Sequence, residues 1–295
     1  MNDNNTVDFS KIKDFVEINN EFNKIKKKRR KKIVVFIINV VTISSLILGG
    51  IGIKSIIDYK EDQKEAKLLQ EELNSKKEEI NNTVIEEETP VVEEEIVDPK
   101  IVALFDELKE QNSDTVAWLK LNNTDIDFPV VKSNDNDYYL NHNFKKKYNE
   151  IGWTFADYRN KFPELNDNTI MYGHTYRNSS LAFSSLKTVL NKSWYNNEEN
   201  HIIEFTTEKK TLKFKIFSIY TVKNTNDYLK INMNEEEFNK FIDKSLDRSI
   251  NNFDTEVNFG DKIITLSTCY NTSNYRLVVH AKLMEETSEE EKQGS

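Results

Sequence analysis

The chain contains a single cysteine, Cys269, in a setting that could support nucleophilic chemistry. It follows the apolar run KIITLST (262–268) and precedes a short polar loop, after which Arg276 opens the next apolar run. Cysteine attacks as a thiolate, and acyl transfer also needs a base and a group that stabilises an oxyanion. Because one cysteine cannot form an intramolecular disulfide, this thiol is either a nucleophile or an inert buried group.

Four histidines could supply the base. His174 ends an apolar run and begins a polar loop, which is where catalytic groups are usually displayed, so it is the favoured candidate. His280 alternates with Arg276 along one strand and is the second candidate. His142 lies in a polar run and His201 follows NNEEN, so both are expected to be solvated. A structural role stays open for every one of them.

Arg276 could act together with the thiol. If the two apolar runs pair as antiparallel strands, Cys269 and Arg276 come close at one rim of a sheet. A guanidinium stays charged and offers several donors in a fixed fork, which suits a thiolate, a carbonyl or an oxyanion. A surface arginine on an edge strand is the alternative.

The elements around these residues are mostly strands. Period-two alternation predicts hairpins from 202–205 with 211–222 and from 262–268 with 275–283, and two short strands within 118–131. A helix is predicted over 234–250, where Asn234 and Glu237 form a capping box before an apolar stripe. Many strands with few helices indicate a β-barrel or sandwich with helical insertions.

The motif TLSTC (265–269), with Arg276 after it and YGH (172–174) before it, resembles the class B sortases. The resemblance extends over about residues 98–284, and the helix at 234–250 is similar to the insertion that marks this class. It implies an eight-stranded β-barrel with peripheral helices, preceded by a transmembrane helix. It also implies a membrane-anchored cysteine transpeptidase of Gram-positive surfaces, with no cofactor and no metal.

The resemblance assigns roles by motif position. Cys269 corresponds to the nucleophile, His174 to the general acid and base, and Arg276 to the clamp for substrate and oxyanion. The substrate-binding positions are Asn136, Leu140, Tyr228, Leu229, Ser267 and Thr268. Some class B members carry an acid just after the cysteine, whereas this chain has Tyr270 and Asn271 there. A dyad assisted by Arg276 is therefore expected.

The first part of the chain predicts a membrane anchor. Residues 1–32 form a basic tail that ends in seven consecutive cations, Lys26 to Lys32. Residues 33–53 follow without a charge and are long enough to span a bilayer. The positive-inside rule then places the N-terminus in the cytoplasm and the later domain outside the cell. A cleaved signal peptide is the alternative.

Between the anchor and the domain, residues 54–98 are expected to form an acidic extracellular stalk and linker. Up to residue 88 they predict a solvated helix, with a short coiled coil as the alternative, and TPVVEEEIVDP (89–99) then breaks the helix. The catalytic domain is predicted over 99–284, and it begins with a helix capped by Asp98. Residues 285–295 are expected to be a disordered tail.

These features predict an enzyme that cleaves the sorting signal of surface proteins after a threonine, through a cysteine thioester. An amine of a peptidoglycan precursor would then accept the acyl group at the membrane. One alternative is a secreted cysteine hydrolase that uses water as the acceptor. The other is an anchored binding domain with an inert thiol. Nucleic acid is not an expected partner because the domain is mildly acidic.

Overall fold

The structure, a computed structural model, describes residues 9–83, 97–176, 179–223, 225–270 and 272–284. It divides into two compact units, residues 1–60 and 61–295. The greater part of the predicted linker, Asn271 and the predicted tail at 285–295 lie outside the described residues.

The described part of the first unit, from residue 9 on, is helical. The helix α1 spans Phe9–Asn82 and continues into the second unit. The side chains of residues 33–53 are exposed in this unit. Among the described residues, α1 is the one helix long and apolar enough to cross a membrane. Such a stretch near the N-terminus fits a membrane anchor or a signal sequence.

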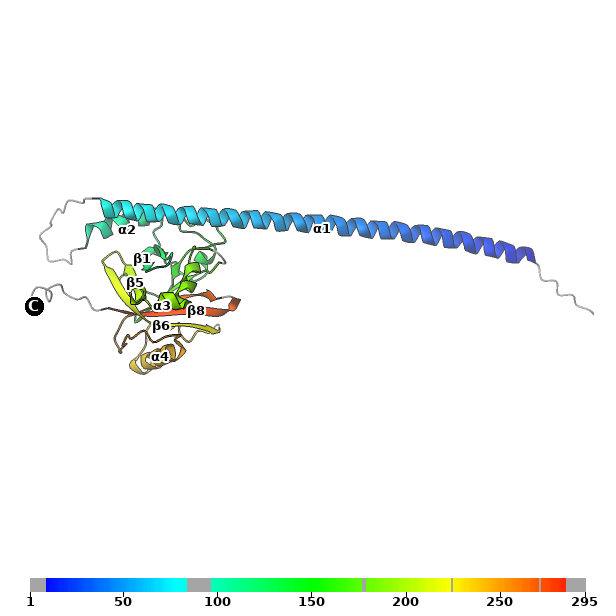
Figure 1. The fold of residues 1–295 in the computed structure, drawn as a ribbon. Helices are drawn as coiled ribbons and strands as arrows, with labels where there is room; N and C mark the ends of the chain where they lie inside the picture. The colour runs from blue at the N-terminus through cyan, green and yellow to red at the C-terminus, as the bar shows by residue number, and fades with distance from the viewer. Residues whose placement is uncertain (1–8, 84–96, 177–178, 224, 271, 285–295) are drawn as a thin grey trace, which may run out of the picture. The chain divides into compact units, whose positions relative to one another are not determined.

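The second unit contains a β-barrel (Figure 1). Within the described residues eight strands close in the order β1-β2-β3-β4-β7-β8-β6-β5, which confirms the expected barrel. The strands are β1 (Thr115–Leu121), β2 (Asp127–Val131), β3 (Phe155–Ala156), β4 (Asn168–Gly173), β5 (Ile202–Thr206), β6 (Thr211–Lys223), β7 (Ile263–Tyr270) and β8 (Thr272–Leu283). The pairs β2–β3 and β4–β7 are parallel and the others are antiparallel.

Strand alternation divides the buried side chains of β8 between two cores. Leu277, Val279 and Ala281 point into the barrel core. Val278 packs in a second cluster on the other side of the sheet. That cluster is covered by α4 (Glu235–Arg248), which lies against β6 (Figure 1). The predicted capping box between Asn234 and Glu237 is present at the start of α4.

The remaining elements are short or peripheral. The helix α2 starts at Pro99 with Asp98 as its cap, as predicted. The bounds are α2 (Pro99–Gln111), η1 (Tyr138–Leu140), η2 (Ser184–Leu190), α3 (Lys192–Tyr195) and η3 (Glu198–His201).

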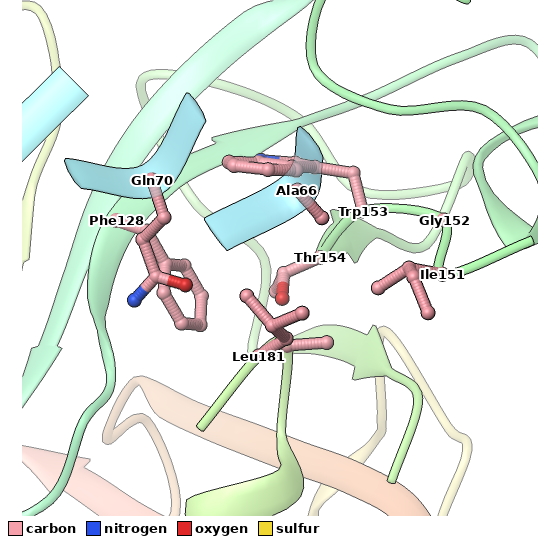
Figure 2. A pocket seen from close by; sticks show the side chains of 9 residues that line it. Ala66, Gln70, Phe128, Ile151, Gly152, Trp153, Thr154 and Leu181 are labelled. Carbon is pink, nitrogen blue, oxygen red and sulfur yellow. The ribbon is translucent and has the colours of Figure 1, made fainter. Parts of the chain in front are cut away.

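The last part of α1 is buried against the barrel rather than solvated. Ala66, Leu69 and Leu73 are at most 4% exposed, and the two leucines belong to the barrel core. Figure 2 shows Ala66 and Gln70 beside Phe128, Trp153 and Thr154, around a small cavity. The expectation of a solvated helix is therefore wrong for this stretch. The apolar spacing that suggested weak heptads is a docking face instead.

Candidate active site

Two parallel strands end side by side at one edge of the barrel. β4 and β7 pair with Gly173 opposite Thr268. His174 and Cys269 are the next residues in the sequence, so each directly follows the last residue pair between these two strands. β8 runs antiparallel to β7 and places Arg276 opposite Cys269. The register therefore gathers the backbone positions of His174, Cys269 and Arg276 at this edge.

The imidazole of His174 is held by one backbone carbonyl. Its Nε2 lies 2.9 Å from the carbonyl oxygen of Leu140. A carbonyl only accepts hydrogen bonds, so Nε2 carries the hydrogen and Nδ1 of the neutral ring is the nitrogen that can take up a proton. Burial lowers the pKa of His174, and the bond to Leu140 opposes this effect in part. The neutral ring of His174 is therefore favoured at neutral pH, with Nδ1 as its proton acceptor.

Thr268 ties the backbone on both sides of His174 to the end of β7. Its Oγ1 donates to the carbonyl oxygen of Gly173 at 2.5 Å and lies 2.5 Å from Oγ1 of Thr175. His174 is the residue between these two partners. The residue before Cys269 thus fixes the backbone that carries the histidine.

A groove with about 480 Å³ of space opens at these strand ends. Its lining includes His174, Arg276 and the six predicted substrate-binding residues, which are Asn136, Leu140, Tyr228, Leu229, Ser267 and Thr268. The side chain of Cys269 lies outside what the structure describes, whereas its backbone pairs with Arg276. The structure therefore brings the remaining predicted site residues together in one groove.

Five further residues line the same groove and were not predicted: Asp137, Phe155, Tyr172, Gly173 and Asn226. Tyr172 and Gly173 belong to the YGH motif, so the sequence did carry a signal for them. Phe155 packs against Tyr172 with ring centres 5.4 Å apart, a contact that no local pattern reveals.

Two of the predicted substrate-binding residues bond to each other. The hydroxyl of Tyr228 lies 3.0 Å from Oγ of Ser267, and both side chains are at most 3% exposed. This contact joins the loop after β6 to the end of β7. The hydrogen bond therefore fixes the orientation of both hydroxyls in the lining of the groove.

The other candidate base, His280, lies away from the groove. It is fully buried between Tyr220 and Thr265, with 2.8 Å from Nε2 to the tyrosine hydroxyl and 2.8 Å from Nδ1 to the threonine hydroxyl. Burial lowers its pKa to about 3, so the ring stays neutral.

His201 was expected to be solvated, but it is only 4% exposed and its Nε2 contacts the carbonyl of Tyr195. His174 is the histidine that lines the groove in the described part of the chain.

Comparisons with known proteins agree with this geometry. A model of the sortase domain family matches residues 119–284, which contain every predicted site residue. Sortase B of Staphylococcus aureus is 34% identical over 184 residues, which is 61% of this chain and 74% of that protein.

Solved structures give the same result. Clostridium perfringens sortase B has a TM-score of 0.57 at 34% identity, covering 61% of this chain and 100% of that chain. A Staphylococcus aureus sortase B–substrate complex has a TM-score of 0.63 at 28% identity, covering 78% of this chain and 100% of that chain.

Proposed function

This chain belongs to the sortase family of cysteine transpeptidases, and we propose that it cleaves the sorting signal of surface proteins after a threonine and transfers the acyl group to an amine of a cell wall precursor. The observation that carries this proposal is the register that gathers His174, Cys269 and Arg276 at one end of a substrate-sized groove.

In the first step Cys269 gives its thiol proton to the neutral ring of His174, and the resulting thiolate attacks the carbonyl carbon of the threonine. The C–N bond of the next peptide link breaks, and His174 gives a proton to the leaving amine. A thioester forms. In the second step the acceptor amine attacks this thioester and gives a proton to His174, and Cys269 leaves as a thiolate. Both steps balance without a cofactor.

Arg276 stabilises the oxyanion in both tetrahedral intermediates. Its backbone partner across β7 and β8 is Cys269, and this pairing supports a role for the guanidinium beside the reacting carbonyl. A guanidinium directed at the oxygen stabilises the negative charge that develops there in the transition state.

The groove holds the sorting signal. Asn136 and Leu140 contribute to its lining from the segment around η1, and Tyr228 and Leu229 contribute from the loop after β6. The peptide lies between these segments with its threonine carbonyl at the end of β7. The substrate complex of the Staphylococcus aureus relative supports a substrate site in this fold.

The anchor places the enzyme where its substrates meet. Residues 33–53 span the membrane, the basic residues before them stay in the cytoplasm, and the barrel lies outside the cell. Enzyme, surface protein and lipid-linked precursor are then held at one surface, which raises their effective concentrations.

The test is a transpeptidation assay with purified full-length chain in detergent. The substrates are a library of peptides with a fixed threonine and a glycine-based amine as acceptor. Wild-type protein is expected to give an amine-linked product, and Cys269→Ala is expected to give neither cleavage nor ligation. Cleavage with water alone as acceptor would instead support a hydrolase. Binding without cleavage would support an anchored binding domain.

A further inference from the structure

A carboxylate that does not line the groove lies buried behind its wall. Asp157 follows β3 and is 0% exposed. Its Oδ1 accepts hydrogen bonds from the backbone N–H of Arg159 at 3.0 Å and from Arg159 Nε at 2.8 Å. Its Oδ2 accepts from Arg159 Nη2 at 2.7 Å, from the hydroxyl of Tyr172 at 2.8 Å and from Nδ2 of Asn136 at 3.1 Å. A buried charge with five donors is fully satisfied.

Two of these donors belong to groove-lining residues from different parts of the chain. Asn136 lies in the loop before η1, and Tyr172 lies on β4 two residues before His174. The oxygen of the Asn136 amide accepts from the backbone N–H of Tyr158 at 2.9 Å, so both ends of that amide are fixed. Asp157 therefore sets which way the Asn136 amide and the Tyr172 ring point.

A third part of the groove is reached through Arg159. The guanidinium of Arg159 binds Asp157, and its Nη2 also donates to the carbonyl oxygen of Leu229 at 3.3 Å. Leu229 lies on the loop after β6, which forms another part of the groove lining. The carboxylate is thus connected to residues from three separate segments that line the groove.

The charge on Asp157 persists at neutral pH. Burial by itself raises the pKa of this carboxyl, but the hydrogen bonds from Arg159 and Tyr172 outweigh burial and hold the pKa below its usual value. The arrangement therefore works as an anion surrounded by donors.

We propose that Asp157 is a positioning residue for peptide binding, because it holds Asn136, Tyr172 and, through Arg159, Leu229 in the places that the sorting signal requires. This inference rests on the proposed role of the groove as the sorting-signal site. Asp157 itself touches neither the peptide nor the reacting atoms.

The substitution Asp157→Asn tests the idea with little change in shape. Whichever way the new amide is turned, its NH₂ group faces at least two donors where the carboxylate offered an acceptor. At the Oδ2 position the NH₂ group removes the acceptor of Asn136 and Tyr172. At the Oδ1 position it removes two acceptor contacts of Arg159, which then holds Leu229 less firmly. We expect peptide binding to weaken by about tenfold or more, which corresponds to the loss of one buried charge-assisted hydrogen bond.

The readout is a dissociation constant measured in the Cys269→Ala background, so that no turnover intervenes. The probe is a labelled pentapeptide from the library with a fixed threonine. It is the member of that library that binds the Cys269→Ala protein most tightly. Asp261→Asn is the matched control, since Asp261 also accepts a backbone N–H and pairs with a lysine, Lys282, but does not line the groove. The control is expected to bind as the parent does.

A second substitution, Tyr172→Phe, removes only the hydroxyl that donates to Asp157 and keeps the ring in the groove. It is expected to weaken binding about threefold to tenfold, and the double variant should lose less than the sum of the two single effects. This variant decides the question if Asp157→Asn does not fold. A further control uses Asp157→Asn protein that retains Cys269. Iodoacetamide is expected to alkylate this cysteine at the same rate as in the wild-type protein.

The inference is overturned if folded Asp157→Asn or Tyr172→Phe binds the probe within twofold of the parent, or if no peptide of the library binds. A protein that binds the peptide as expected but never cleaves it leaves this inference in place. That result would overturn the proposed function alone.

Discussion

Gly152 lies directly against the carbonyl group of Leu140, the same carbonyl that accepts the hydrogen bond from His174 Nε2. A Cβ at Gly152 would come within 2.6 Å of that carbonyl oxygen and 2.5 Å of the carbonyl oxygen of Tyr139. Its φ of +65° is also unfavourable for other residues. The absence of a side chain at Gly152 therefore allows the carbonyl to reach the histidine.

The substitution Gly152→Ala is expected to displace the Leu140 carbonyl and misalign His174. Because small displacements of a catalytic group are costly, kcat should fall roughly tenfold to a hundredfold. The measurement is steady-state kinetics with a cleavable sorting peptide, together with thermal unfolding.

The control for this change is Gly260→Ala. Gly260 also has a positive φ, +99°, but a Cβ there meets nothing within 4 Å. It shares the backbone strain, about 1–2 kcal/mol, without the clash. Equal losses of kcat in the two variants would contradict the assigned role of Gly152.

The pKa of His174 is expected to lie below its ordinary value of 6.5, because burial disfavours the imidazolium. In the folded Cys269→Ala protein, where no thiol titrates with it, the ring should stay neutral as the pH falls past 6.5. The unfolded chain takes up a proton in that window. The contribution of this group to stability is therefore lost as the pH falls toward the folded pKa.

NMR of the histidine ring carbons, followed against pH with and without denaturant, measures both titrations. The denatured sample serves as the control and should titrate near the ordinary value. A folded midpoint at or above 6.5 would show that burial does not govern this group.

Arg276→Lys keeps the positive charge but loses the planar fork. If the fork holds the developing oxyanion, kcat should fall about a hundredfold, as when one oxyanion donor is removed. Arg276→Gln removes the positive charge but keeps N–H donors. Its kcat should fall at least as much as that of Arg276→Lys. Single-turnover cleavage of the sorting peptide measures both. Activity of Arg276→Lys within threefold of wild type would exclude a role for the fork.

The buried face of α1 makes a stability prediction. Leu73 is 0% exposed in the barrel core, so Leu73→Ala should lower the free energy of unfolding by about 2–5 kcal/mol. Leu68 is 55% exposed on the same helix, and Leu68→Ala should change that free energy by less than about 0.5 kcal/mol. Denaturant unfolding of the full chain in detergent compares them. Similar effects of the two changes would argue against docking of α1.

The sequence predicted those parts of the site in which local pattern decides structure. Alternation in β7 and β8 predicted the hairpin that pairs Cys269 with Arg276, and the capping box predicted the start of α4. The YGH and TLSTC motifs then located the groove.

What the sequence could not predict depends on partners far away in the chain. The apolar spacing of Leu69 and Leu73 shows a face but not what covers it, and the barrel core covers it. His201 follows a polar run, yet the rings of Trp194 and Phe253 pack against it. Asp157 meets donors distant in sequence, and no local pattern marks a carboxylate as buried.

The central claim is that Cys269 forms a thioester that an amine resolves, and intact-protein mass spectrometry tests it most directly. Wild-type protein mixed with the sorting peptide should gain the mass of the fragment that ends in threonine, on Cys269. A glycine-based amine should remove this adduct and yield the ligated peptide. Cleavage of the peptide with no adduct on Cys269, or an equal adduct on the Cys269→Ala protein, would contradict the account.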